Sequence, residues 1–169
     1  LALFYKDKVL RENSVYRFLR SVFSNGFGGG MHSILFDAIR EKLGLCYSIY
    51  SAKLDHNYFG AGAIGCSLSE INIDKAVDEI MKITEVIKKD GYSKDFLSLV
   101  KRNCILGAIK VFDSSGGISH IADSCFKQQN LLTFKDYQKG ISKIKNDDIV
   151  RYANEIFKER LKVVKMTKG

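Results

Sequence analysis

Apolar residues recur at helical spacing through most of the chain. Near the N-terminus, Asn13 or Ser14 can cap a helix that Asn25-Gly26 ends. Between these limits the apolar positions fall on one helical face: Val15, Phe18, Leu19, Val22 and Phe23. The same spacing predicts further helices over 31–42, from 72 to 91, from 93 to a break at 114–117, over 118–126, from 133 and from 146.

Capping residues support the helices of the second half. Thr133 with Asp136 three residues later resembles a capping box, although Asp replaces the usual Glu or Gln. Asn146 is expected to cap the last helix. Gly44 and Gly91 are the kind of residue that ends a helix, and they follow the second and third predicted helices.

The remaining apolar segments have the pattern of strands. Residues 2–6 and 161–166 are expected to be strands at the two ends, and 45–51 and 58–66 to be two strands joined by a turn at 55–57. Small residues fill the second of these joined strands, which suits close approach of another backbone. Strands before and after a helical block predict an α+β fold with a mixed sheet of about four strands, covered on one face by helices.

The chain is expected to form a single domain over residues 1–169. It contains no proline, and therefore no rigid proline-rich linker. Its length allows roughly 70% of the unfolded surface to be buried, enough for one core. Because the chain begins with Leu1 rather than Met, we expect it to be a piece of a longer protein.

The chain carries 27 Lys and Arg against 19 Asp and Glu, a formal charge of +8. Such a charge favours either a polyanionic partner or simply a lysine-rich, soluble surface. The basic residues are scattered, and no aromatic and basic signature of an RNA-binding sheet is present, so the second interpretation is preferred. No stretch is long and apolar enough to predict a membrane span.

Signatures of common catalytic and metal sites are missing. The four cysteines form no Cys-x-x-Cys pair and are expected to be buried free thiols. His32, His56 and His120 have no metal-ligand spacing, so no metal site is predicted in this chain. The glycine-rich segment 26–30 lacks the Lys-Ser/Thr ending of a phosphate-binding loop and the third glycine of the dinucleotide fingerprint. No serine lies in a nucleophile elbow.

One long segment resembles a known family. It reads Gly-Gly-Gly-Met-His-Ser-Ile-Leu-Phe over 28–36 and Ile-Arg-Glu-Lys-Leu-Gly-Leu-Cys-Tyr-Ser-Ile-Tyr-Ser over 39–51. The segment resembles the non-metal, C-terminal-type domain of the insulinase/pitrilysin-type zinc metallopeptidases, which include the mitochondrial processing peptidase. The order of strands and helices fits over nearly the whole chain. His32 and Ile34 depart from the pattern, which often has Ser and Arg there.

The resemblance implies a division of labour between two similar domains or two chains. The other half would carry the zinc and the inverted His-x-x-Glu-His motif, so zinc is expected in the partner and no cofactor in this chain. The family's substrate-contacting Arg and Tyr correspond to Arg40 and Tyr47, which are expected to contact the substrate carbonyl. Gly28, Gly29 and Gly30 correspond to a substrate-binding loop.

We consider three alternative functions for this chain. The first is the substrate-binding and transition-state-assisting half of a zinc metalloendopeptidase, which would be inactive by itself. Its expected partners are the zinc-carrying domain or subunit and a peptide substrate, and a dimer is one arrangement of the two halves. The second is a non-catalytic structural or assembly subunit of the same fold. The third, a basic nucleic-acid-binding module, has only the net charge in its favour.

Overall fold

The computed structural model describes residues 1–7, 14–55, 60–114, 117, 119, 122 and 133–166. One sheet runs through the described part in the order β2-β3-β1-β4. Its strands are β1 (Ala2–Asp7), β2 (Cys46–Asp55), β3 (Gly60–Leu68) and β4 (Lys162–Val164). The four predicted strands are confirmed, but the sheet is not mixed, since all three strand pairs are antiparallel. Apolar alternation reports which residues face the core and carries no information on strand direction.

The helices follow the predicted order with shifted ends. They are α1 (Ser14–Gly28), the π-helix η2 (Phe36–Lys42), the 3-10 helix η3 (Glu70–Asn72), α2 (Ile73–Asp90), α3 (Lys94–Phe112), α5 (Phe134–Lys143) and α6 (Asn146–Ile156). The expected capping box is confirmed: Asp136 N–H donates to Thr133 Oγ1 at 3.2 Å, and Thr133 N–H to Asp136 Oδ2 at 3.1 Å. Most of the helix predicted over 118–126 lies outside the described residues, and the two described ones, 119 and 122, are helical.

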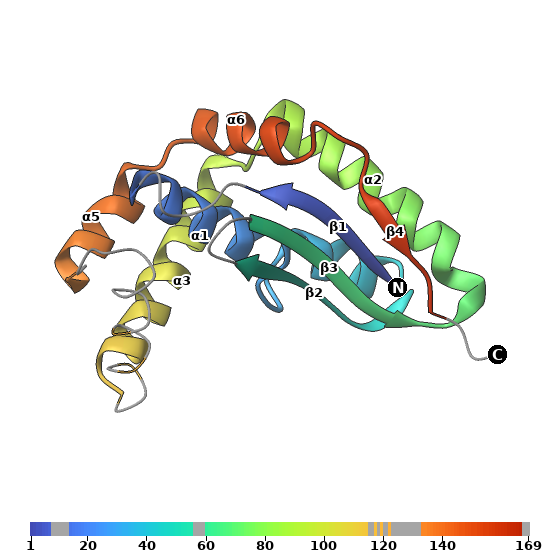
Figure 1. The fold of residues 1–169 in the computed structure, drawn as a ribbon, viewed down its shortest axis with the longest axis horizontal. Coiled ribbons are helices and arrows are strands. Elements are labelled where there is room, and N and C mark those ends of the chain that lie inside the picture. Colours follow the sequence, from blue (N-terminus) through green and yellow to red (C-terminus); the bar gives the residue numbers. More distant parts are fainter. Residues whose placement is uncertain are drawn as a thin grey trace.

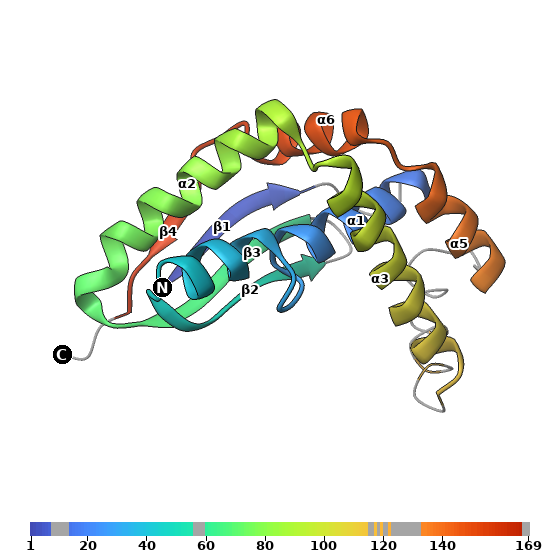
Figure 2. The same ribbon diagram turned by 180° about the vertical axis from the view of Figure 1, so that it is seen from behind.

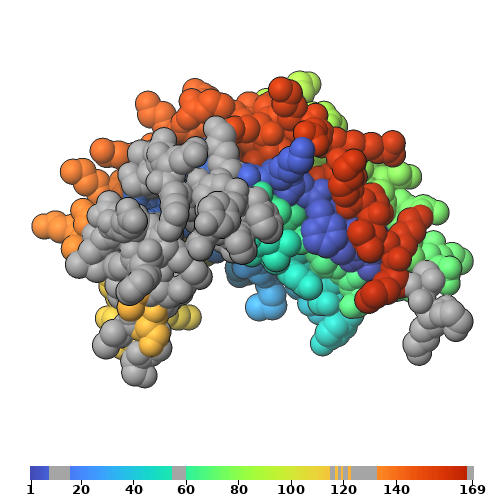
Figure 3. Space-filling model, viewed as in Figure 1, coloured from blue at the N-terminus to red at the C-terminus, as the bar shows by residue number. Residues whose placement is uncertain are grey.

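The helices cover one face of the sheet, as expected. In Figure 1 the strands lie on the near side, and in Figure 2, from behind, α1 and η2 lie in front of them. Leu3, Tyr5 and Ile64 are buried in the core, and the Tyr5 ring packs against Phe157 at the end of α6. On the other side, atoms of β1 and β4 lie at the surface of the space-filling view (Figure 3). No helix in the described part of the chain has the length and apolarity to cross a bilayer.

The small residues of β3 make room for tyrosine rings. Tyr5 is paired with Gly62, and Tyr50 with Gly65. A Cβ atom at either glycine would overlap the ring of its tyrosine. The expected close approach is therefore made by aromatic side chains and not by another backbone.

A buried ionic cluster joins the end of β1 to the helices. Arg20 Nε of α1 lies 2.6 Å from Asp7 Oδ2, and the two side chains are 2% and 1% exposed. Tyr16 and Tyr152 each donate a hydroxyl hydrogen bond of 2.8 Å to the Asp7 carboxylate. Burial raises the pKa of the Tyr152 hydroxyl well above its ordinary value, and the Asp7 charge adds to the effect. The cluster thus fixes β1 against both α1 and α6.

Asn146 is not the cap that the sequence predicts. Residue 145 takes the cap position of α6, and the Asn146 side chain reaches instead to the turn between α2 and α3. There its Oδ1 accepts from Tyr92 N–H at 2.7 Å, and its Nδ2 donates to Asp90 O at 2.9 Å. An amide side chain that matches two backbone groups satisfies both of them at once.

We expect Asn146→Ala to lower the free energy of unfolding by about 1–3 kcal/mol, because it leaves the part-buried Tyr92 N–H without its acceptor and also removes the hydrogen bond to the exposed Asp90 C=O. Urea unfolding followed by circular dichroism measures the change. The control Lys143→Ala, at an exposed position of α5, should change the value by less than about 0.5 kcal/mol. Equal effects of the two substitutions would show that the bridge contributes nothing.

Candidate functional site

Arg40 lies on a helix that is wound more widely than an α-helix. Over Phe36–Lys42 the helix is of the π type, where the sequence predicts an ordinary helical turn. At its end Leu43 N–H donates to Ala38 O at 3.2 Å, a step of five residues. The ion pair of 2.7 Å between Lys42 and Asp37 spans the same step. Such widened turns are frequent at functional sites, because they rotate the following side chains away from their α-helical directions.

Tyr47 lies at an irregularity of the next element. Cys46 is paired with Leu68, but Ser48 is paired with Ser67, so Tyr47 is an extra residue opposite the bond between them. A β-bulge of this kind turns a side chain out of the regular alternation. The Tyr47 side chain is 82% exposed, whereas Ile49, two residues later on the same strand, is buried.

The π-helix and the bulge bring Arg40 and Tyr47 together. The guanidinium carbon of Arg40 lies 5.1 Å from the centroid of the Tyr47 ring and 4.6 Å from that of Phe36. Arg40 is 34% exposed, and its Nε is 3.7 Å from the Glu41 carboxylate. A cation stacked on rings keeps its orientation while its N–H groups stay able to donate. The structure therefore places the Arg40 guanidinium against the Tyr47 ring, and both side chains reach solvent.

Phe36 is a residue of this site that the sequence analysis missed. The Phe36 side chain is buried, and the Arg40 guanidinium lies over its ring. The available signal was its position four residues before Arg40, where two residues share a helical face. Motif matching alone does not show that an aromatic ring orients the arginine.

The three glycines of the predicted loop are placed differently from one another. Gly28 is the last residue of α1 and is buried, and a Cβ there would overlap Ser51 of β2. Gly28 thus serves the contact between helix and sheet. Gly29 and Gly30 are exposed, and Gly30 has a φ of 147° that favours glycine. For all three glycines, contact with substrate stays a prediction.

Cys46 lies next to Tyr47 but has the properties of a structural thiol. Burial raises the pKa of the Cys46 thiol above its ordinary value, and the nearby charge of Arg40 opposes this only in part. Burial likewise raises the pKa of Cys66 to about 11. Both cysteines are free. Within the described ranges, no three His, Cys, Asp or Glu side chains are grouped as metal ligands.

Comparison with known proteins assigns the chain to a protein family. The family description "Peptidase M16 inactive domain" matches residues 6–104. A zinc protease of Rickettsia felis is 32% identical over 141 residues, which is 78% of this chain and 32% of that protein. The Bacillus subtilis protein named "Probable inactive metalloprotease YmfF" is 24% identical over 165 residues, 98% of this chain and 38% of that protein. The chain belongs to the M16 peptidase family, as a domain of its inactive type.

The fold agrees with this assignment. A protease from Helicobacter pylori superimposes with a TM-score of 0.81 and 25% identity, over 92% of this chain and 38% of the other. The resemblance to insulinase-type peptidases that the motif at 28–51 indicates is therefore confirmed. This chain spans about a third of the length of these curated relatives.

Proposed function

We propose that this chain is the substrate-binding half of a zinc metalloendopeptidase and is inactive without a zinc-carrying domain or subunit. The observation that carries the proposal is the pair formed by Arg40 and Tyr47, which stand 5.1 Å apart from guanidinium carbon to ring centroid. Two proteins that resemble the chain are named for proteolysis, the R. felis zinc protease and the H. pylori protease. The described residues offer no metal-binding group of their own, so the zinc is expected in the other half.

The chemistry of amide hydrolysis explains how a guanidinium and a phenol can assist the reaction. Zinc-assisted hydrolysis of an amide places negative charge on the former carbonyl oxygen. Donors that already point at this oxygen stabilise the charge without having to reorganise. The Arg40 guanidinium supplies a permanent positive charge with several N–H donors, and Tyr47 supplies one hydroxyl donor. Both groups reach solvent on this chain, so a substrate held by the facing half can contact them.

We expect Arg40→Gln to lower kcat/KM about 10- to 100-fold, since it removes a charge-assisted hydrogen bond to the substrate. The measurement is cleavage of a fluorogenic peptide by the full-length protein, or by this chain mixed with its zinc-carrying subunit. This chain by itself should cleave nothing.

The matched control is Arg151→Gln, at an arginine of α6 whose side chain is 72% exposed and pairs with Asp148. It should leave kcat/KM unchanged. Indifference of cleavage to Arg40→Gln would remove the role given to this residue. If no zinc-carrying partner restores cleavage at all, the chain is better described as a structural or assembly subunit.

A further inference from the structure

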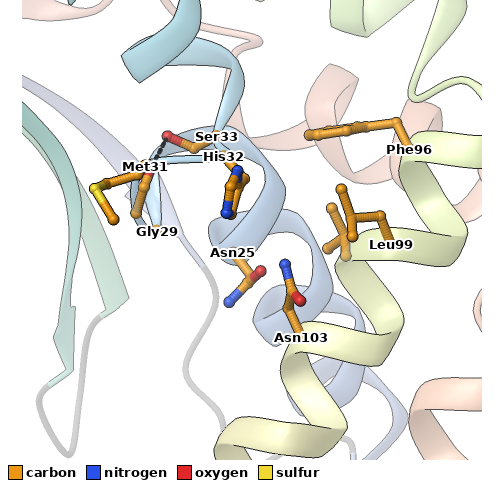
Figure 4. Close-up of a pocket in the computed structure, with 10 residues that line it drawn as sticks. Asn25, Gly29, Met31, His32, Ser33, Phe96, Leu99 and Asn103 are labelled. Carbon is orange, nitrogen blue, oxygen red and sulfur yellow. Dashed lines mark hydrogen bonds between the residues drawn. The ribbon is translucent and has the colours of Figure 1, made fainter.

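A cavity of about 150 Å³ lies between the end of α1, the loop that follows it and α3 (Figure 4). Its rim on the loop side includes Gly29, Gly30 and His32, which are exposed, so the cavity is open to solvent there. Its opposite wall comes from α3, with Phe96 and Leu99. Two of the glycines expected to contact substrate thus form the entrance of a cavity that the sequence analysis did not foresee.

The lining combines an apolar wall with uncharged polar groups. The side-chain amides of Asn25 and Asn103 come from α1 and α3 and reach the same cavity. Both residues are half-buried, and neither amide hydrogen-bonds to any part of the chain that the structure describes. None of the lining residues is Asp, Glu, Lys or Arg. The cavity therefore suits a neutral group with an apolar body and a tip that can donate and accept hydrogen bonds.

The walls are held in place without a ligand. Ser33 Oγ donates to Gly30 O at 2.6 Å, and Gly29 N–H donates to Asn25 O at 3.3 Å. On the other side the Phe96 ring packs edge-on against the Tyr92 ring, with centroids 5.2 Å apart. The Tyr92 hydroxyl in turn donates to Phe23 O of α1 at 2.8 Å, which joins the turn before α3 to α1. A preformed cavity loses little conformational entropy when it is filled.

We propose that this cavity binds the side chain of a tyrosine in the peptide substrate. The identification of the occupant as part of a substrate rests on the function proposed above. A cavity of about 150 Å³ holds a benzene-sized ring. The ring would lie against Phe96 and Leu99, and the phenolic hydroxyl would reach the amides of Asn25 and Asn103. A charged side chain would be left without a counter-charge, and a purely aliphatic one would leave both amides unpartnered.

The first test measures binding directly and needs no zinc or cleavage. The ¹⁵N-labelled chain is titrated with N-acetyl-tyrosinamide, N-acetyl-phenylalaninamide and N-acetyl-lysinamide, and NMR shifts are followed. We expect saturable shifts at the side-chain amides of Asn25 and Asn103 and at Gly29 and Gly30. The tyrosine probe should bind about 3- to 10-fold more tightly than the phenylalanine probe, the effect of one hydrogen bond. Absence of saturable shifts there, or equal binding of the lysine probe, overturns the proposal.

Two variants separate the parts of the cavity. Leu99→Trp should fill it and abolish the shifts, whereas Leu106→Trp, at an exposed leucine of the same helix, should leave them unchanged. Asn103→Leu should keep the phenylalanine probe bound and remove the preference for tyrosine. This variant also tests the hydrogen bond if Leu99→Trp fails to fold.

The second test measures whether the cavity affects cleavage of a peptide. In the zinc-containing protein, a peptide with tyrosine should show a KM several-fold lower than its phenylalanine counterpart, and Asn103→Leu should remove this difference. If the probes bind but the KM values agree, the cavity is a tyrosine site without a role in substrate binding, and the assignment of the occupant is wrong. If Arg40→Gln leaves cleavage unchanged while the tyrosine probe still binds, only the proposed function is contradicted.

Discussion

Asp7→Ala should lower the free energy of unfolding by about 3–5 kcal/mol, the largest effect on stability that we expect for a single substitution in this chain. The reason is the charge that it leaves behind. Arg20 is 2% exposed, and its Nε is 2.6 Å from the carboxylate that would be removed. Without Asp7 the buried guanidinium loses this close counter-charge, and two tyrosine hydroxyls lose their acceptor. Urea unfolding followed by fluorescence or circular dichroism measures the loss.

A double substitution tests whether the buried charge is the cause. Arg20→Met in the Asp7→Ala background should restore part of the lost stability, because it removes the buried charge that has lost its close carboxylate and keeps an apolar side chain in its place. Lys6→Ala is the matched surface control. Its ion pair with Glu159 joins side chains that are 83% and 64% exposed, so it should contribute less than about 1 kcal/mol. If Asp7→Ala and Lys6→Ala have the same small effect, the cluster does not hold β1 to the helices.

Tyr47→Phe should lower kcat of the assembled peptidase about 100- to 1000-fold while KM changes little. The substitution removes one hydroxyl and keeps the ring on which the Arg40 guanidinium rests, at 5.1 Å from the ring centroid. A donor that acts on the charged oxygen of the transition state affects turnover more than substrate binding. Tyr47 is 82% exposed in this chain, so the full effect requires the facing zinc half to exclude water. Steady-state cleavage of a fluorogenic peptide measures both constants.

Tyr50→Phe is the control for this measurement. Tyr50 is on the same strand and 54% exposed, and its ring lies over Gly65. The control should keep kcat within about two-fold of the original value. A rise in KM with unchanged kcat for Tyr47→Phe would mean that the hydroxyl binds the ground state only. No change in either constant would exclude Tyr47 as a transition-state donor.

Much of the fold could be predicted from patterns of short range. Helical spacing placed α1, α2, α3, α5 and α6, and alternation placed the hairpin of β2 and β3. Asn146 shows where such reasoning fails. A short polar residue before a helix predicts a cap, yet the turn between α2 and α3, 54 residues earlier, supplies better partners for its amide. A partner so distant in sequence leaves no local signal.

The sequence by itself determined the family and the residue types of the candidate site. The reason is that the motif at 28–51 matches many residue types at the same spacing along the chain. Only the tertiary structure decided where these side chains point. A π-helix and a β-bulge, which are too small to alter the apolar pattern, bring Arg40 against Tyr47. Packing of α1 against β2 buries Gly28, and packing of α3 beside the loop creates the cavity at Gly29 and Gly30. The cavity arises from contacts between elements far apart in the chain, and such contacts exist only once the core has formed.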